Sequence, residues 1–269
     1  MKITPMVQQL LVITVVAFFG VNLIGNPAAN YQRLSLYHFE NPNFRFWQPL
    51  THVFMHAPLP DLSHIMFNMF GLYSFGSALE HFWGGKKFLF FYLSCGLGAA
   101  LVHSLVNFYE VQQALNAVAN LGLSKSETSF FLNADFSSFF DANNHFINQK
   151  AAAILEKTHC NQAQFNLLNQ AANNFQTTAV GASGAIYGII VAFAFMFPNA
   201  ELALLFVPIP IKAKYFVPIL VGFDLFSGVT GFSIFGGGNI AHFAHVGGAL
   251  FGLLMMWVWK SPLKPRQNF

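Results

Sequence analysis

One serine in an apolar stretch has the surroundings of a nucleophile. Ser183 lies in the segment Gly181-Ala182-Ser183-Gly184, at the start of an apolar run. Glycines on both sides let a substrate backbone come close, and the start of a helix offers free amide donors to a developing oxyanion. Gly184 and Gly188 are also a small-xxx-small pair, which is typical of helix packing in membranes. The motif alone therefore leaves catalysis and packing open.

A histidine that could act as the base lies in a later apolar stretch. His245 follows Ala244 and precedes Gly248 and Gly252, which form a close-packing face on the same helix. If that face packs against the glycines around Ser183, the imidazole comes within the hydrogen-bond reach that a general base needs. His242, one turn earlier, lies nearer the expected aqueous boundary, so we favour His245. A lone membrane histidine is more often a hydrogen-bonded structural group, which is the alternative.

A polar pair in another apolar stretch could stabilise an oxyanion. His64 and Asn68 are four residues apart and therefore share one face of a helix. Both donate hydrogen bonds without needing a charge, and losing one oxyanion donor typically costs about 10²- to 10³-fold in rate. The alternative is a pair that bonds across helices for packing alone. Chemistry is favoured because the serine, the pair and the histidine occur in three separate stretches.

Two other kinds of site compete for these polar residues. His52 and His56, together with His64 and His242, could be zinc ligands. The chain has no HExxH motif and no suitably spaced carboxylate to activate a zinc-bound water, so we expect no metal and no other cofactor. A transporter is the second alternative, because Asp224 and several histidines fall near membrane depth. No repeat of interrupted helices, which many transporters have, is visible.

The elements that must position these side chains are those of a membrane protein. Of the 269 residues, 55% are hydrophobic and 9% are charged, whereas soluble domains have roughly 25% charged residues. The 34 phenylalanines exceed what one soluble core of this size would bury. The net charge of +3 is small and the basic residues are scattered, which argues against nucleic-acid binding. We therefore expect the lipid bilayer to be the main solvent.

Six stretches have the apolar character of a membrane span, which takes about 20 helical residues. The first could be a secretory signal, but its apolar run is longer than a signal core, and Asn26 and Pro27 predict a turn. We expect a retained helix there. The fifth is the weakest, because Pro218 and Asp224 interrupt it. The six expected spans are 7–24, 62–79, 88–108, 180–197, 215–226 and 241–259.

Basic residues in the short connections predict the orientation. They fall alternately on one side of the expected spans, which places both termini in the cytoplasm. These cations are Lys2, Lys86, Lys87, Lys212, Lys214, Lys260, Lys264 and Arg266.

The longest interruption, 107–178, falls on the opposite side of the membrane. Its polar Asn and Gln alternate with Phe, Leu and Ala, which predicts a helical extracytoplasmic insert rather than disorder. We expect a single membrane domain over residues 1–269 that contains this insert.

The order of these motifs resembles the rhomboid family of intramembrane serine proteases. The resemblance rests on three segments: Gly181 to Gly184, His64 to Asn68, and Ala244-His245 with Gly248 and Gly252. It implies an all-α bundle of six transmembrane helices and a water-filled cavity open to the extracytoplasmic side. The fifth helix and the Gly-rich segment 228–239 would act as gate and cap.

The resemblance also implies roles for individual residues. Ser183 would attack the scissile carbonyl of a transmembrane protein substrate, with His245 as base and no third acidic member. His64, Asn68 and the Ser183 amide would hold the oxyanion, and the Tyr187 ring would pack against His245. An acyl-enzyme would form and water would resolve it.

The family likeness and the compact length favour the inner membrane of a bacterium as the location. A rhomboid-like protein that binds membrane clients without cutting them is the alternative. Such a protein would be expected to lack the serine or the histidine, and Ser183 and His245 are both present.

Overall fold

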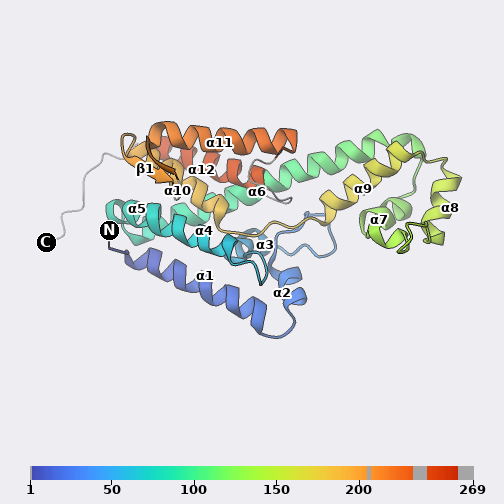
Figure 1. The fold of residues 1–269 in the computed structure, drawn as a ribbon, viewed down its shortest axis with the longest axis horizontal. Helices are drawn as coiled ribbons and strands as arrows, with labels where there is room; N and C mark the ends of the chain where they lie inside the picture. The colour runs from blue at the N-terminus through green and yellow to red at the C-terminus, as the bar shows by residue number, and fades with distance from the viewer. Residues whose placement is uncertain (1, 205–206, 233–240, 260–269) are drawn as a thin grey trace. The chain divides into compact units, whose positions relative to one another are not determined.

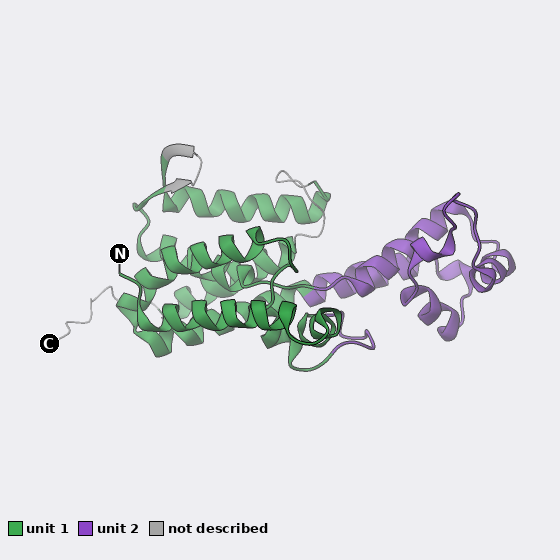
Figure 2. Cartoon of the chain, turned by 60° about the horizontal axis from the view of Figure 1, so that its bottom comes forward, with its two compact units in different colours: residues 1–36, 45–103, 179–269 green, residues 37–44, 104–178 purple. Residues whose placement is uncertain are grey.

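The fold is mainly helical, and the chain divides into two compact units. The computed structural model describes residues 2–204, 207–232 and 241–259 (Figure 1). Unit 1 consists of residues 1–36, 45–103 and 179–269, and unit 2 of residues 37–44 and 104–178 (Figure 2). Most of the expected Gly-rich cap, 228–239, and the tail cations Lys260, Lys264 and Arg266 lie outside the described residues.

Unit 1 contains the helices that carry the expected chemistry. Residues of α6 up to 103 belong to it. Its helices are α1 (Pro5–Leu23), α2 (Pro27–Leu34), α3 (Gln48–Thr51), η1 (His52–Phe54), α4 (Ser63–Gly71), η2 (Leu72–Gly76), α5 (Ser77–Trp83), α6 (Gly85–Ala117), α10 (Ser183–Met196), α11 (Ala213–Thr230) and α12 (His242–Trp259).

These helices are those of a multi-pass membrane protein. Four described helices, α1, α6, α11 and α12, are long and apolar enough to cross a membrane, and α10 is apolar but shorter. Large apolar side chains face outward on them, among them Val16 on α1 and Trp257 on α12, each 65% exposed. Polar Glu80 and Asp224 are instead buried. An apolar exterior around buried polar groups suits lipid as the surrounding medium.

The segment Ser63–Trp83 is helical throughout but changes its winding in the middle. A five-residue π-helical turn, η2, joins α4 to α5. Such turns are rare inside helices and often occur at functional sites. His64 and Asn68 lie before this turn, and Glu80 lies after it.

Glu80 is far from α1 in the sequence, yet its side chain caps the N-terminal end of this helix. Its carboxylate accepts hydrogen bonds from the Thr4 hydroxyl at 2.5 Å and from the amides of Met6 and Val7 at 2.9 and 2.8 Å. The first amides of a helix have no partner within it, and a negative charge at this end is favourable. The buried carboxylate and the helix end therefore satisfy each other.

A short hairpin adds β-structure to the helical fold. Strands β1 (Glu201–Leu204) and β2 (Val207–Lys212) pair antiparallel between α10 and α11. Glu201 lies opposite Lys212, a cross-strand pair of opposite charges that stabilises a hairpin. Hydropathy did not predict these strands.

Unit 2 has a hydrophobic core of its own. Its elements after α6 are η3 (Ala119–Leu121), α7 (Lys125–Leu132), η4 (Phe136–Phe139), α8 (Gln149–Lys157) and α9 (Gln162–Gln176). Buried apolar side chains from these elements form one cluster, which includes Phe131, Phe139, Ala151, Ile154, Leu168 and Ala172. The polar and apolar alternation in the sequence is therefore that of packed amphipathic helices.

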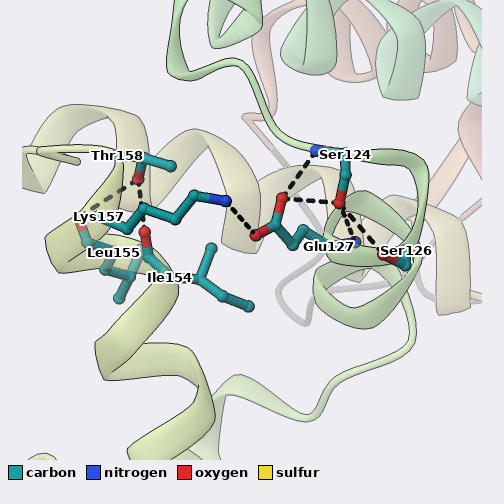
Figure 3. A network of polar contacts seen from close by, with 7 residues as sticks. All are labelled: Ser124, Ser126, Glu127, Ile154, Leu155, Lys157 and Thr158. Atoms are coloured by element: carbon teal, nitrogen blue, oxygen red, sulfur yellow. Dashed lines mark hydrogen bonds and ion pairs between the residues drawn. The ribbon is translucent and has the colours of Figure 1, made fainter.

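Helix caps stabilise unit 2 locally. The Ser124 side chain and the Glu127 carboxylate form a capping box at the start of α7 (Figure 3). Glu127 also accepts a hydrogen bond from Lys157 of α8 at 3.1 Å. Asn161 and Gln164 form a second capping box at α9.

Candidate active site

Glycines bring the backbones of α10 and α12 together, and these helices lie side by side (Figure 1). A Cβ atom built on Gly248 would lie 1.8 Å from the carbonyl oxygen of Gly184. A Cβ on Gly252 would lie 2.7 Å from Cα of Gly188, and real Cβ atoms essentially never come within 3.0 Å of such neighbours. The two small-xxx-small pairs of the sequence therefore face each other.

This packing puts Ser183 against His245. Ser183 is the first residue of α10, one position before Gly184, and its Oγ lies 2.8 Å from Nε2 of His245. The His245 side chain is 13% exposed. With the hydroxyl as donor, Nε2 is the acceptor and the ring proton of neutral His245 is on Nδ1. A serine hydroxyl bonded to an imidazole in this way can pass its proton to the ring.

The ring of Tyr187 fixes the plane of the imidazole. Tyr187 lies one turn after Ser183 on α10, and its ring stacks on His245 with 4.3 Å between centroids and 11° between planes. The stack limits rotation of the imidazole about the Cβ–Cγ bond of His245. Both ring nitrogens lie at the ring edge and can still form hydrogen bonds.

A carboxylate from α11 meets the other nitrogen of His245. Oδ1 of Asp224 lies 3.1 Å from Nδ1 of His245 and 2.6 Å from Nδ1 of His242. The Tyr187 hydroxyl donates to Oδ2 of the same carboxylate. The family resemblance implied no acidic member, so this contact is a difference from expectation. The available hint was an aspartate at membrane depth, which is costly unless it is paired.

His64 lies beside Gly181, in the loop that precedes α10 and Ser183. Gly181 has a φ of +125°, which only glycine adopts readily, and a Cβ there would lie 2.8 Å from Nε2 of His64 and 3.5 Å from Oγ of Ser183. The Ala57 amide donates to Nδ1 of His64 at 3.2 Å. Neutral His64 therefore has its proton on Nε2, which is the nitrogen on the side of Gly181 and Ser183.

Asn68 joins this group through His64. Its side-chain amide donates to the His64 carbonyl at 2.7 Å, one turn back on α4. The residue is 5% exposed, and its Oδ1 is buried without a hydrogen-bond partner. The second amide hydrogen of Asn68 remains for another acceptor. The structure thus connects Asn68 to His64, and it records no direct contact of Asn68 with Ser183.

The beginning of α10 supplies further donors. Because the helix begins at Ser183, the amides of its first residues have no acceptor within the helix. These amides and the positive end of the helix dipole favour a negative oxygen beside Ser183. The Nε2–H of His64 is a second kind of donor, near Gly181 and Ser183.

The carboxylate and its two histidines are also the group of described residues that could hold a metal ion. Possible ligand atoms of Asp224, His242 and His245 lie within 4.8 Å of one another. The two short nitrogen to oxygen distances given above are direct hydrogen bonds, so these groups satisfy each other as they stand. Of the zinc ligands considered from the sequence, His242 belongs to this group, whereas His52 bonds to the Gln48 carbonyl at 3.2 Å.

Comparison with known proteins bears on the family of the chain. Residues 43–155 and 158–262 match the model of the rhomboid domain. RHOMBOID-like protein 12, mitochondrial, of Arabidopsis thaliana is 26% identical over 220 residues, which are 82% of this chain and 47% of the relative. The chain thus spans about half the length of that curated relative. Because the domain match covers most of the sequence, the chain belongs to the rhomboid family.

Proposed function

We propose that this chain is an intramembrane serine endopeptidase that cuts transmembrane proteins near the outer leaflet. Ser183 is the nucleophile and His245 is the base. The observation that carries the proposal is the 2.8 Å contact between Ser183 Oγ and His245 Nε2 beside the unpaired amides of α10. The family supports the same activity, although a rhomboid-like protein need not be catalytic.

The geometry supports acyl transfer in two steps. The Ser183 oxygen bonds to the scissile carbonyl carbon, its proton passes to His245 Nε2, and the carbonyl electron pair moves to oxygen. When the C–N bond breaks, His245 gives the proton to the leaving amine and an acyl-enzyme remains. Water then repeats the sequence, with His245 taking and returning a proton, and releases the acid.

The oxyanion formed in each step needs donors that are already in place. The Ser183 amide can take this role because Ser183 is the first residue of α10. The Ala57 amide donates to Nδ1 of His64, which leaves Nε2–H for the same role. Asn68 donates one amide hydrogen to the His64 backbone carbonyl and has the other left for the oxyanion. Prearranged donors of this kind supply a large share of rate enhancement in acyl transfer.

Six transmembrane helices are proposed around this site. Besides the four long apolar helices, Ser63–Trp83 has 21 residues, which span about 31 Å as a helix. The shorter α10 begins at the nucleophile, so Ser183 would lie below the membrane surface with water above it. The basic connections favour cytoplasmic termini. Unit 2 would then be an extracytoplasmic insert with a core of its own, and α11 would be the gate for a substrate helix.

The proposed substrates are transmembrane proteins whose helix unwinds easily near the outer leaflet, because a cut needs an exposed backbone. The proposed location is a bacterial inner membrane. The plant relative is named as a mitochondrial protein, which makes a mitochondrial location the alternative for this chain.

The test compares the native chain with Ser183→Ala in membranes that contain a model transmembrane substrate. We expect Ser183→Ala to abolish cleavage and fluorophosphonate labelling and His245→Ala to leave only a slow residual rate of both, because each lacks one partner of the proton transfer. Ser126→Ala, which removes an exposed hydroxyl in unit 2, is the control and should label normally. A native chain that folds but is never labelled would instead favour a client-binding protein.

A further inference from the structure

We propose that Asp224 is a positioning residue that fixes the tautomer and orientation of His245 and balances its charge during catalysis. The inference rests on the proposed function, and it adds a third member to the serine and histidine pair. Asp224 touches no substrate in this scheme, and its effect passes entirely through the imidazole.

The first argument is the direction of the hydrogen bonds along the chain of three groups. Ser183 donates to Nε2 of His245 at 2.8 Å, which leaves the ring proton on Nδ1. Nδ1 faces Oδ1 of Asp224 at 3.1 Å, where that proton has an acceptor. The opposite tautomer would place a proton between Nε2 and the serine hydroxyl, and His245 could not then accept the serine proton. Asp224 therefore favours the tautomer that the base requires.

The second argument is the burial of the carboxylate. Asp224 is 7% exposed, and an ionised carboxylate in such a place is costly unless it is hydrogen-bonded. Three donors from two other helices converge on it, namely Tyr187, His242 and His245. The carboxylate can thus stay ionised at this depth. A side chain that only packed between helices would not need these three donors.

The third argument is the charge around His245. His64 of α4 and His103 of α6 lie close enough to interact electrostatically with the His245 ring, and His242 precedes it on α12. None of these rings carries a negative charge, so none of them can balance a positive charge on His245. Among the described residues that bond to His245, Asp224 is the one that carries a negative charge and favours the imidazolium formed during proton transfer.

Tyr187 contacts both His245 and Asp224. Tyr187 lies on the face of His245 and donates its hydroxyl to Asp224. The ring plane is thus set by the stack and the in-plane direction by the carboxylate. His245 keeps two constraints besides its bond to Ser183, which suits a base that must hold one orientation.

The experiment is a double-mutant cycle on the full chain in membranes or nanodiscs. Asp224→Asn keeps the shape and removes the charge, and we expect fluorophosphonate labelling of Ser183 to slow by about 10²-fold, within the range of general acid–base effects. In substrate cleavage kcat should fall while KM changes little. In the His245→Ala background, Asp224→Asn should cause no further loss, because the residue acts through the imidazole.

A second measurement applies to the native chain and does not depend on the variant folding. With ¹⁵N-labelled histidine, the signal that disappears in His245→Gln should show the proton on Nδ1. A proton on Nε2 would overturn the proposal. Labelling of Asp224→Asn at the native rate would also overturn it. An equal further loss of rate when Asp224→Asn is added to His245→Ala would do the same. A native chain without any labelling would instead refute the proposed function itself.

Discussion

Replacing Gly248 by alanine should separate Ser183 from His245 without changing either residue. The added Cβ would lie 1.8 Å from the Gly184 carbonyl oxygen, and contacts below 3.0 Å essentially never occur. The two helices must therefore part by at least about 1.2 Å, since packed interiors have little free space. Gly184 adjoins Ser183, and Gly248 is one turn from His245, so the separation acts at the level of their hydrogen bond.

The size of the effect follows from that displacement. Adding 1.2 Å to a 2.8 Å hydrogen bond stretches it past the useful range unless the side chains turn to compensate. A misplacement of about 1 Å can cost about 10²-fold in rate. We expect kcat for a transmembrane substrate to fall by about that factor with little change in KM. Overpacking should also lower stability by about 1–3 kcal/mol, seen by thermal unfolding in nanodiscs.

Two other glycines provide matched controls. A Cβ on Gly252 would meet Cα of Gly188 at 2.7 Å, so Gly252→Ala should cost less activity than Gly248→Ala. A Cβ on Gly20 of α1 meets nothing within 4 Å, so Gly20→Ala should be active and slightly more stable. The reasoning would fail if Gly248→Ala cut at the native rate, or if Gly252→Ala lost more activity than Gly248→Ala.

Two further predictions concern charged groups away from Ser183. Hydrogen bonds from Ser124 and Lys157 hold the pKa of Glu127 down to about 2, so its stabilisation of α7 is present above pH 4.5 and is lost as the pH falls toward 2. Hydrogen exchange at the start of α7, corrected for intrinsic rates, should show this dependence in the native chain and not in Glu127→Gln. Glu80→Ala leaves the Thr4 hydroxyl and two amides of α1 without this acceptor and should destabilise the chain by about 1–3 kcal/mol in thermal unfolding, whereas Glu80→Gln should cost less. Equal stability of both variants and the native chain would contradict the capping role.

The glycine spacing is the part of the candidate site that sequence predicts well. Gly184 and Gly188, and Gly248 and Gly252, repeat at one helical turn, so each pair must share a face whatever the rest of the chain does. Facing glycines then fix which two helices touch. The proximity of Ser183 and His245 follows from their position beside these pairs.

The contact between Asp224 and His245 could not be predicted in the same way. Its contact with His245 joins residues 21 positions apart on two different helices. Whether they meet depends on how α11 is rotated about its own axis, and hydropathy does not specify that rotation. In the sequence the aspartate is visible mainly as a polar interruption of the fifth span.

Hydropathy also does not predict where the helices begin and end. The fourth span was expected from 180, but Gly181 has a positive φ and α10 begins at Ser183. The third was expected to end at 108, but α6 continues to Ala117 because helix-favouring residues follow the apolar run. Apolarity marks where lipid contact is favourable, whereas backbone conformation decides where a helix stops.

The π-helical turn in Ser63–Trp83 makes this helix intolerant of a change in length. One residue added to a helix rotates everything beyond it by about 100°. With η2 in place, His64 is directed to the loop before Ser183 while Glu80 meets the N-terminal end of α1. Deleting one residue from 72–76 would restore regular winding and turn one of these two residues away from its partners. The extra residue is what allows one helix to serve two unrelated sites at once.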